Sequence, residues 1–225
     1  MIAASRILIA GGSGLIGQAV LEQLLARPSI QIVALVRRPL GLVAPELTEI
    51  VCDFGSLEAH PLPDADVAIC CLGTTLKVAG SREAFHRVDF DYIVNFARAA
   101  KKAGVKRFVL LSSAGASPSA RVYYSRVKGE TETAVKDVGF ERLVIARPSL
   151  LLGDRGRLGQ PTRPIESAAQ GFLKPLVAII PMAFRPIRAE VVARALVRLA
   201  DEAGQGILIA ESARLFQAGS EKPGS

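Results

Sequence analysis

The chain has 225 residues, of which 50% are hydrophobic and 22% are charged, and its formal net charge is +7. This length can bury one large core, and the composition excludes an intrinsically disordered chain. The basic residues are scattered, with neither a basic arm nor a nucleic-acid motif, so we expect no direct nucleic-acid binding.

Targeting and metal signals are also missing from the sequence. No apolar run approaches the roughly 18 residues of a membrane span, and the first apolar run leads directly into a glycine turn rather than a cleavage site. Neither the cysteines (Cys52, Cys70, Cys71) nor the histidines (His60, His86) have the spacing of a disulfide framework or metal site. We therefore expect a cytoplasmic protein without a metal or a membrane partner.

Apolar runs of strand length alternate with helical patterns along most of the chain. The predicted strands are 6–12, 30–38, 47–53, 66–73, 105–113, 142–148 and 206–213. The predicted helices are 15–27, 81–103, 189–204 and one that begins within 122–130. Such alternation of continuous apolar strands with helices predicts an α/β fold of the Rossmann type, a doubly wound parallel sheet covered on both faces.

The pattern loosens after Pro148. Residues 153–184 are rich in glycine, arginine and proline, and predict loops with one short helix. Without a linker or an internal repeat, we expect a single domain over residues 1–215. Within it, residues 154–205 would form a small C-terminal extension on the substrate side. Residues 216–225 are expected to be a flexible tail.

Three glycines, Gly11, Gly14 and Gly17, follow the first predicted strand at intervals of three and open a predicted helix. Glycine there permits a tight turn, lets backbone N–H groups approach a pyrophosphate, and lets the helix pack closely on the strand. A glycine triplet alone is a weak signal. Between a strand and a helix, it favours a dinucleotide-binding site over a merely structural turn.

Two arginines, Arg37 and Arg38, stand about twenty residues beyond the last of these glycines, where an NAD-preferring protein usually carries Asp or Glu. Guanidinium groups suit a ribose 2′-phosphate, both as charges and as hydrogen-bonding forks. The alternative is a pair of arginines at a solvated strand end. We expect a preference for NADP(H) over NAD(H).

Other polar and glycine-containing segments follow the third, fourth and fifth predicted strands. They are Asp53, the stretch "CLGTT" at 71–75, and the stretch "LSSAGA" at 111–116. Cofactors of open α/β sheets lie across the carboxyl ends of the strands, so we expect cofactor contacts from these segments. Asp53 could equally be a turn or helix-capping residue.

The stretch "YYSRVK" contains two adjacent tyrosines and a lysine. Tyr124 and Lys128 are four residues apart and would share one face of a helix, whereas Tyr123 would turn away. A free phenol, with a pKa near ~10, is a poor acid–base at neutral pH, but an ammonium and an oxidised nicotinamide favour the phenolate. Ser113 or Ser112, at the end of the preceding strand, could hydrogen-bond a substrate oxygen. This arrangement indicates an acid–base site.

Together, "GGSGLIG", "LLSSAG" and the segment from Tyr124 to Lys128 resemble the short-chain dehydrogenase/reductase superfamily. The stretches "CCLGTT", "VDFDYIV", "YYSRVKGETE" and "RPSLLLGDR" are similar to its atypical branch, typified by the Tat-interacting-protein oxidoreductase of animals and its bacterial relatives. The likeness spans roughly residues 6–213.

The resemblance implies roles for individual residues. Tyr124 would be the proton donor and acceptor, Lys128 would hold the nicotinamide ribose, and Ser113 would orient the substrate oxygen, with Ser112 as the alternative. Many members also use a helical asparagine in a proton relay, and Asn95 lies in the preceding helix. With the glycine and strand-end arguments, the expected cofactor contacts are Gly11, Ser13, Gly14, Leu15, Ile16, Gly17, Arg37, Arg38, Asp53, Leu72, Gly73, Tyr124 and Lys128.

The sequence thus predicts an NADPH-dependent oxidoreductase that transfers a hydride between the nicotinamide and a small carbonyl or alcohol substrate. The alternative is an NADPH-binding regulatory or scaffold protein with little or no turnover. We expect a monomer or a homodimer whose partner is a small-molecule substrate.

Overall fold

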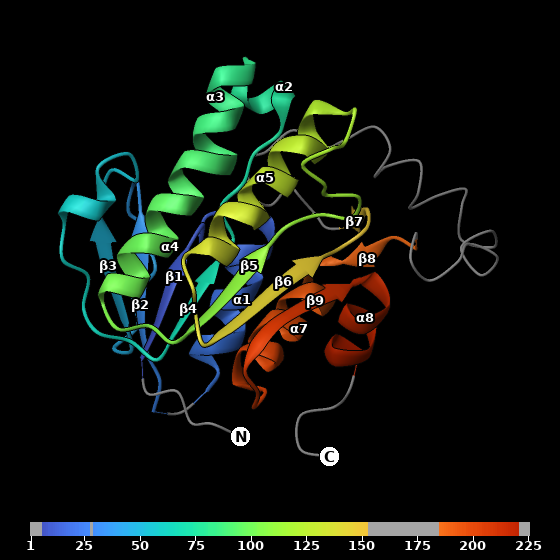
Figure 1. Ribbon diagram of the computed structural model, residues 1–225. Helices are drawn as coiled ribbons and strands as arrows, with labels where there is room; N and C mark the ends of the chain where they lie inside the picture. Colours follow the sequence, from blue (N-terminus) through green and yellow to red (C-terminus); the bar gives the residue numbers. More distant parts are fainter. Residues whose placement is uncertain (1–5, 28, 153–184, 221–225) are drawn as a thin grey trace.

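The computed structural model of the protein describes residues 6–27, 29–152 and 185–220. Seven parallel strands form one sheet in the order β3-β2-β1-β4-β5-β6-β9, which confirms the predicted doubly wound parallel sheet (Figure 1). The strands are β1 (Arg6–Ala10), β2 (Gln31–Val36), β3 (Leu47–Val51), β4 (Val67–Cys70), β5 (Arg107–Leu111), β6 (Arg142–Arg147) and β9 (Gly206–Glu211).

The strand order reverses at β1. The chain builds outward from β1 through β2 to β3, then returns to place β4 on the other side of β1. At the carboxyl end of β1, Ala10 is therefore in register with both Leu35 of β2 and Cys70 of β4. A reversal of this kind leaves a crevice at the carboxyl ends of the strands, where open α/β sheets bind their ligands.

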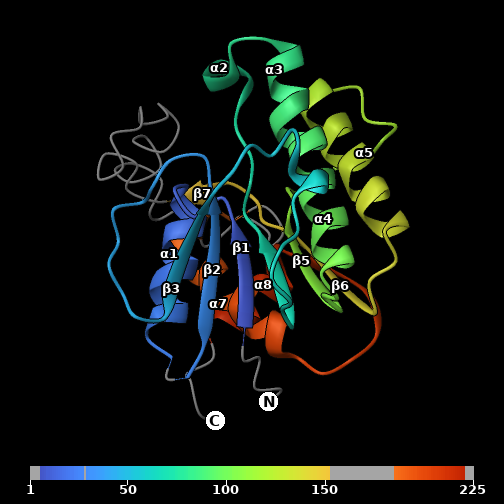
Figure 2. The same cartoon turned by 90° about the vertical axis from the view of Figure 1, so that its left-hand side faces the viewer.

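Two helical layers cover the sheet, with α1 and α7 on one face and α4 and α5 on the other (Figure 2). Alternate residues of β1 supply the two cores, because successive side chains of a strand point to opposite faces. Ile7 and Ile9 pack towards α1 and α7, whereas Leu8 and Ala10 pack towards α4. The helices of the described residues are α1 (Leu15–Leu25), α2 (Leu76–Ala79), α3 (Arg82–His86), α4 (Tyr92–Lys102), α5 (Tyr123–Asp137), α7 (Ala189–Asp201) and α8 (Ser212–Ser220).

The long helix expected at 81–103 contains a widened π-helical turn, η2 (Arg87–Asp91), between α3 and α4. The helix begins where the Ser81 side chain accepts a hydrogen bond from the N–H of Ala84, at 3.0 Å. A π turn rotates the residues that follow it, because it holds an extra residue. Around this turn, Phe85, Asp89 and Ile93 are buried, whereas Val88 and Tyr92 are only partly buried.

The C-terminal part differs from the predicted organisation in two places. Residues 189–201, expected in the substrate-side extension, form α7, which packs against α1 as part of a covering layer. Residues 216–220, expected in a flexible tail, are the second half of α8, where Ala218 is buried. Apolar residues on one face of each helix explain both differences, since that face is buried against the sheet.

Residues 154–184 of the predicted extension lie outside the described residues. Before and after them in the chain, β7 (Leu151–Leu152) and β8 (Ile187–Arg188) form a short parallel pair of strands. The pair brings the chain back to the sheet at the start of α7.

A buried ion pair ties α5 to the strands beside it. Arg147, the last residue of β6, binds Glu132 of α5 through two contacts, Nε to Oε1 at 2.9 Å and Nη2 to Oε2 at 2.6 Å. The same guanidinium reaches Glu211 at the end of β9, at 3.1 Å. Only 2% of the Glu132 side chain is exposed, so its charge depends on Arg147 for compensation.

We expect Arg147→Met to destabilise the fold by about 3–5 kcal/mol, because Glu132 would keep a buried carboxylate without a counter-charge. Urea denaturation measures the change. The control is Lys106→Met, which removes an exposed ion pair with Glu141, of 3.4 Å, and should barely move the transition. Equal losses of stability in the two variants would contradict this account.

Candidate active site

The glycine turn after β1 passes against the backbone at the end of β4. Gly11 has a φ of +87°, and a Cβ on it would lie 2.5 Å from the Cys71 carbonyl carbon and 2.6 Å from the Leu72 nitrogen. A Cβ on Gly17 would lie 2.0 Å from the Gly11 oxygen. Side chains at these two positions would collide with backbone, which no rotamer change relieves. The turn thereby brings Leu72 beside the start of α1.

The N-terminus of α1 offers backbone donors to an anion. Its N-cap is Gly14, no side chain caps it, and its first turn carries no acidic residue. The N–H groups of Leu15, Ile16 and Gly17 have no carbonyl partner within the helix, as in any α-helix. Ser13 is exposed beside them, whereas the Ile16 side chain is buried in the core, which leaves only its backbone N–H for binding. These donors and the helix dipole fit a pyrophosphate.

Arg37 and Arg38 follow β2 at the same edge of the sheet. Both are exposed, and in the described part of the chain neither forms an ion pair. Asp53, after β3, uses its Oδ1 to accept the N–H of Gly55 at 2.9 Å. The turn role, which was the alternative for Asp53, is thus present in the structure, and the two guanidinium groups remain the polar groups at this edge that suit a phosphate.

Lys128 does not lie alone beside Tyr124. Its Nζ is 2.7 Å from Oδ1 of Asp89, and the two side chains are 6% and 0% exposed. The pair packs against Gly73. A Cβ added to Gly73 would lie 3.3 Å from Oδ1 of Asp89 and 3.4 Å from Nζ of Lys128. Burial acts to lower the pKa of Lys128, but the nearby Asp89 charge and then Tyr124 act to raise it, and the net pKa is raised. Lys128 is therefore an ammonium at neutral pH.

Sequence reasoning missed Asp89. A signal was present, because Asp89 follows Phe85 by four residues and so shares the buried face of the long helix. An acidic residue at a core position requires a buried counter-charge. The counter-charge is supplied by a lysine 39 positions later in the chain, which no local pattern connects to it.

The two adjacent tyrosines have different surroundings. The Tyr123 hydroxyl donates to the Arg82 carbonyl oxygen at 3.1 Å, and its ring lies 5.0 Å from the Arg82 guanidinium and 5.4 Å from that of Arg126. The Tyr124 ring packs on Phe85, with 5.5 Å between centroids. Its hydroxyl has no hydrogen bond to any of the described residues.

The two serines at the end of β5 differ in the same way. Ser112 is buried, and its hydroxyl donates to Oε1 of Glu132 at 2.5 Å. The Ser113 hydroxyl oxygen is buried but finds no partner among the described residues. Buried hydroxyls normally have a partner in the protein or in bound water or ligand, so within the described ranges Ser113 is the serine of this pair whose hydroxyl lacks a protein partner.

Asn95 is engaged elsewhere. Its side-chain nitrogen donates to the carbonyl oxygens of Phe54 at 2.9 Å and Gly55 at 3.2 Å, in the loop after β3. The group that faces Lys128 from the long helix is therefore the Asp89 carboxylate and not the Asn95 amide.

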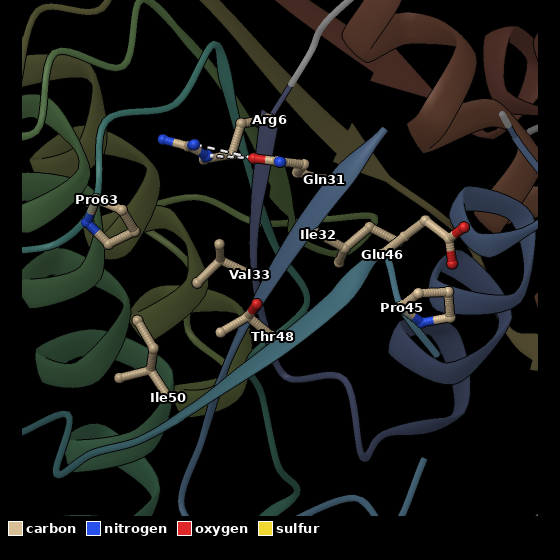
Figure 3. A pocket seen from close by; sticks show the side chains of 9 residues that line it. All are labelled: Arg6, Gln31, Ile32, Val33, Pro45, Glu46, Thr48, Ile50 and Pro63. Carbon is tan, nitrogen blue, oxygen red and sulfur yellow. Dashed lines mark hydrogen bonds between the residues drawn. The ribbon is translucent and has the colours of Figure 1, made fainter. Parts of the chain in front are cut away.

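A hollow of about 290 Å³ lies beside β1, β2 and β3, on the side of the sheet edge where β1 and β2 begin, away from the crevice at their carboxyl ends (Figure 3). Arg6, at the start of β1, points along its rim and donates to the Gln31 side chain, and it also binds Asp64 at 2.7 Å. The Arg6 guanidinium already has partners, and the hollow lies away from Tyr124 and Lys128. This hollow is therefore not part of the candidate active site.

Comparison with known proteins agrees with this geometry. Residues 11–169 match a family described as NAD(P)H-binding. The chain is 40% identical over 172 residues to the protein HTATIP2 of Rattus norvegicus, covering 74% of this chain and 69% of that protein. It is 36% identical over 177 residues to "Protein fmp52, mitochondrial" of Emericella nidulans, covering 75% of this chain and 74% of the relative.

Among solved structures, MoeE5 in complex with UDP-glucose and NAD superposes with a TM-score of 0.67 at 20% identity, covering 91% of this chain and 74% of that one. At this identity the likeness shows the fold alone. Across the described ranges, none of the helices is long and apolar enough to cross a membrane.

The expectation of a cytoplasmic protein is wrong. Several fungal relatives, including those of Aspergillus niger and Aspergillus clavatus, are named mitochondrial, which points away from a purely cytoplasmic location. The expectation was drawn from sequence features that do not distinguish the cytoplasm from an organelle.

The family match and the two relatives together identify the family of this chain. The chain belongs to the NAD(P)H-binding family, in the branch of the short-chain dehydrogenase/reductase superfamily that includes HTATIP2 and fmp52.

Proposed function

We propose that the protein is an NADPH-dependent oxidoreductase acting on a small carbonyl or alcohol, with Ser113, Tyr124 and Lys128 as its acid–base set. One observation supports this most directly. The hydroxyls of Tyr124 and Ser113 have no partner in the described residues, although their chain neighbours Tyr123 and Ser112 are both hydrogen-bonded. The Tyr124 hydroxyl, on the same helix face as the buried Lys128 ammonium, and the Ser113 hydroxyl at the end of β5 are therefore available to a substrate oxygen.

Three groups of residues would hold the cofactor at the crevice. Backbone N–H groups at the start of α1 would bind the pyrophosphate, and Arg37 and Arg38 would bind the 2′-phosphate. Lys128 would hold the ribose next to the nicotinamide, beside Leu72 and Gly73. Bound NADPH supplies the hydride. The residues proposed for the pyrophosphate are Gly11, Ser13, Gly14, Leu15, Ile16 and Gly17.

Tyr124 is the proton donor in this proposal. While hydride adds to the carbonyl carbon, the Tyr124 hydroxyl gives its proton to the carbonyl oxygen, and Ser113 hydrogen-bonds the same oxygen to hold it in place. The Lys128 ammonium, one helical turn away, stabilises the phenolate that remains. The phenolate then regains a proton from water. In the reverse direction the phenolate accepts the alcohol proton.

We expect Tyr124→Phe to lower kcat by at least about 100-fold, the usual contribution of a positioned general acid, with little change in NADPH affinity. NADPH oxidation with a panel of aldehydes, ketones and quinones measures the rate, and fluorescence titration measures the affinity. Tyr123→Phe is the matched control, because it removes a hydroxyl that donates to the Arg82 carbonyl oxygen, and this variant should keep its activity.

Tight NADPH binding by the wild type without Tyr124-dependent turnover on any member of the panel would contradict the proposal. That result would favour a regulatory or scaffold protein that binds NADPH without turnover.

We expect Arg37→Glu to weaken NADPH binding by about 10-fold or more with little effect on NADH. The estimate follows from the ~1.5–3 kcal/mol of a hydrogen bond to a charged group. Isothermal titration calorimetry with both cofactors measures the effect. Lys106→Glu makes the same charge change at the amino edge of the sheet and is the control. Equal losses of affinity for NADPH and NADH would contradict the proposed NADPH preference.

A further inference from the structure

Asp89 and Lys128 form an ion pair sealed inside the protein. Their charged atoms are 2.7 Å apart, and neither side chain is more than 6% exposed. A buried ion pair is a poor source of stability, because the cost of removing both charges from water offsets most of their attraction. An apolar pair of similar size would hold η2 and α5 together as well. The position of the pair next to Tyr124 suggests a different role for it.

The Asp89 carboxylate is held from several directions. Its Oδ2 accepts the backbone N–H of Thr74 at 2.8 Å, in the loop after β4. The backbone carbonyl oxygen of Asp89 accepts a hydrogen bond from the Thr131 hydroxyl of α5 at 2.7 Å. Gly73 lies directly against it, and the π-helical turn η2 points the side chain inward. Asp89 is therefore a rigid point of attachment for the lysine and does not follow the motion of a flexible loop.

Three titratable groups face the Lys128 ammonium. They are Asp89 from η2, Tyr124 from α5 itself, and Cys70 from the end of β4. Burial raises the pKa of Cys70 to about 12, so its thiol is neutral at neutral pH. Tyr124 carries a charge only as the phenolate. Asp89 is thus the ion-pair partner of Lys128, with 2.7 Å between Nζ and Oδ1.

We propose that Asp89 is a positioning residue, which keeps Lys128 charged and aimed beside Tyr124 during proton transfer. The inference rests on the proposed function, because it assigns Asp89 a role in the same acid–base site. An ammonium has three N–H donors, and Asp89 engages it from one side only. The remaining donors stay available for the ribose hydroxyls.

Asp89→Asn would preserve size and shape while removing the negative charge. Without that charge, the proton on Lys128 and the proton on the phenol are both easier to lose. Whichever leaves first, reduction stops, since it needs a protonated phenol and an ammonium. We therefore expect the alkaline limb of kcat for carbonyl reduction to move about 1–3 pH units lower, the usual effect of a charge at this distance.

The matched control is Asp91→Asn. Asp91 lies in the same turn, is half exposed, and faces His86 at 3.6 Å instead of Lys128. The alkaline limb of kcat for Asp91→Asn should coincide with that of the wild type. Coincident limbs for wild type and Asp89→Asn would overturn the positioning role even if Tyr124-dependent turnover is normal.

A second measurement needs neither cofactor nor turnover. In protein labelled with ¹³C-lysine, the Lys128 Cε signal is assigned by its loss in Lys128→Arg and followed with pH by NMR. In the wild type we expect Lys128 to stay protonated above the ordinary pKa range of a lysine, and in Asp89→Asn we expect it to lose its proton below that range. An unchanged Lys128 titration would overturn the inference alone. A shifted titration with no Tyr124-dependent turnover would overturn the proposed function and, with it, the positioning role.

If Asp89→Asn does not fold, thermal unfolding of two other variants decides the pairing. Lys128→Met leaves the Asp89 carboxylate buried without a partner, whereas Lys128→Met combined with Asp89→Asn removes both charges. We expect the double variant to melt at the higher temperature. A double variant no more stable than Lys128→Met would overturn the inference.

Discussion

The close approach of the glycine turn to the end of β4 determines the geometry of the whole crevice. Because Gly11 lies against the backbone of Cys71 and Leu72, the N-terminus of α1 and the loop after β4 share one edge of the sheet. Gly73, in that loop, packs in turn on the charged atoms of Asp89 and Lys128. The N-terminus of α1 and the ammonium of α5 are thereby connected through one short backbone segment, and any side chain at Gly11 would push them apart.

Helix α5 is held by two buried ion pairs of opposite polarity. Lys128 binds Asp89 on the side of α4, and Glu132, one turn later, binds Arg147 at the end of β6. Each pair joins α5 to a different part of the fold, so together they restrict both its rotation and its tilt. Tyr124 stands one turn before the first pair, and none of the described residues hydrogen-bonds its hydroxyl. A proton-transfer group benefits from such support, because small displacements of a reacting group cost rate.

Much of the fold could be predicted from the sequence, because it depends on local patterns. Apolar runs located the strands, and the glycine spacing located the first turn, since both follow from backbone geometry. The partner of Asp89 could not be predicted. Its spacing from Phe85 marks Asp89 as a core position, but its counter-charge, Lys128, lies 39 positions later in the chain. The role of Asn95 was open for a related reason, since its partners lie in a loop some 40 residues earlier in the chain.

By itself, the sequence determined the parallel sheet, the glycine turn, and the placement of Tyr124 and Lys128 on one face of a helix, because each depends on residues close in the chain. Only the tertiary structure decided which hydroxyls are free and which charges are paired. Ser112 is occupied by Glu132, Tyr123 by Arg82, and Lys128 by Asp89, and each partner comes from another element. The reason is physical: burial makes pairing obligatory for polar groups, but chain topology, not local sequence, decides which partner is within reach.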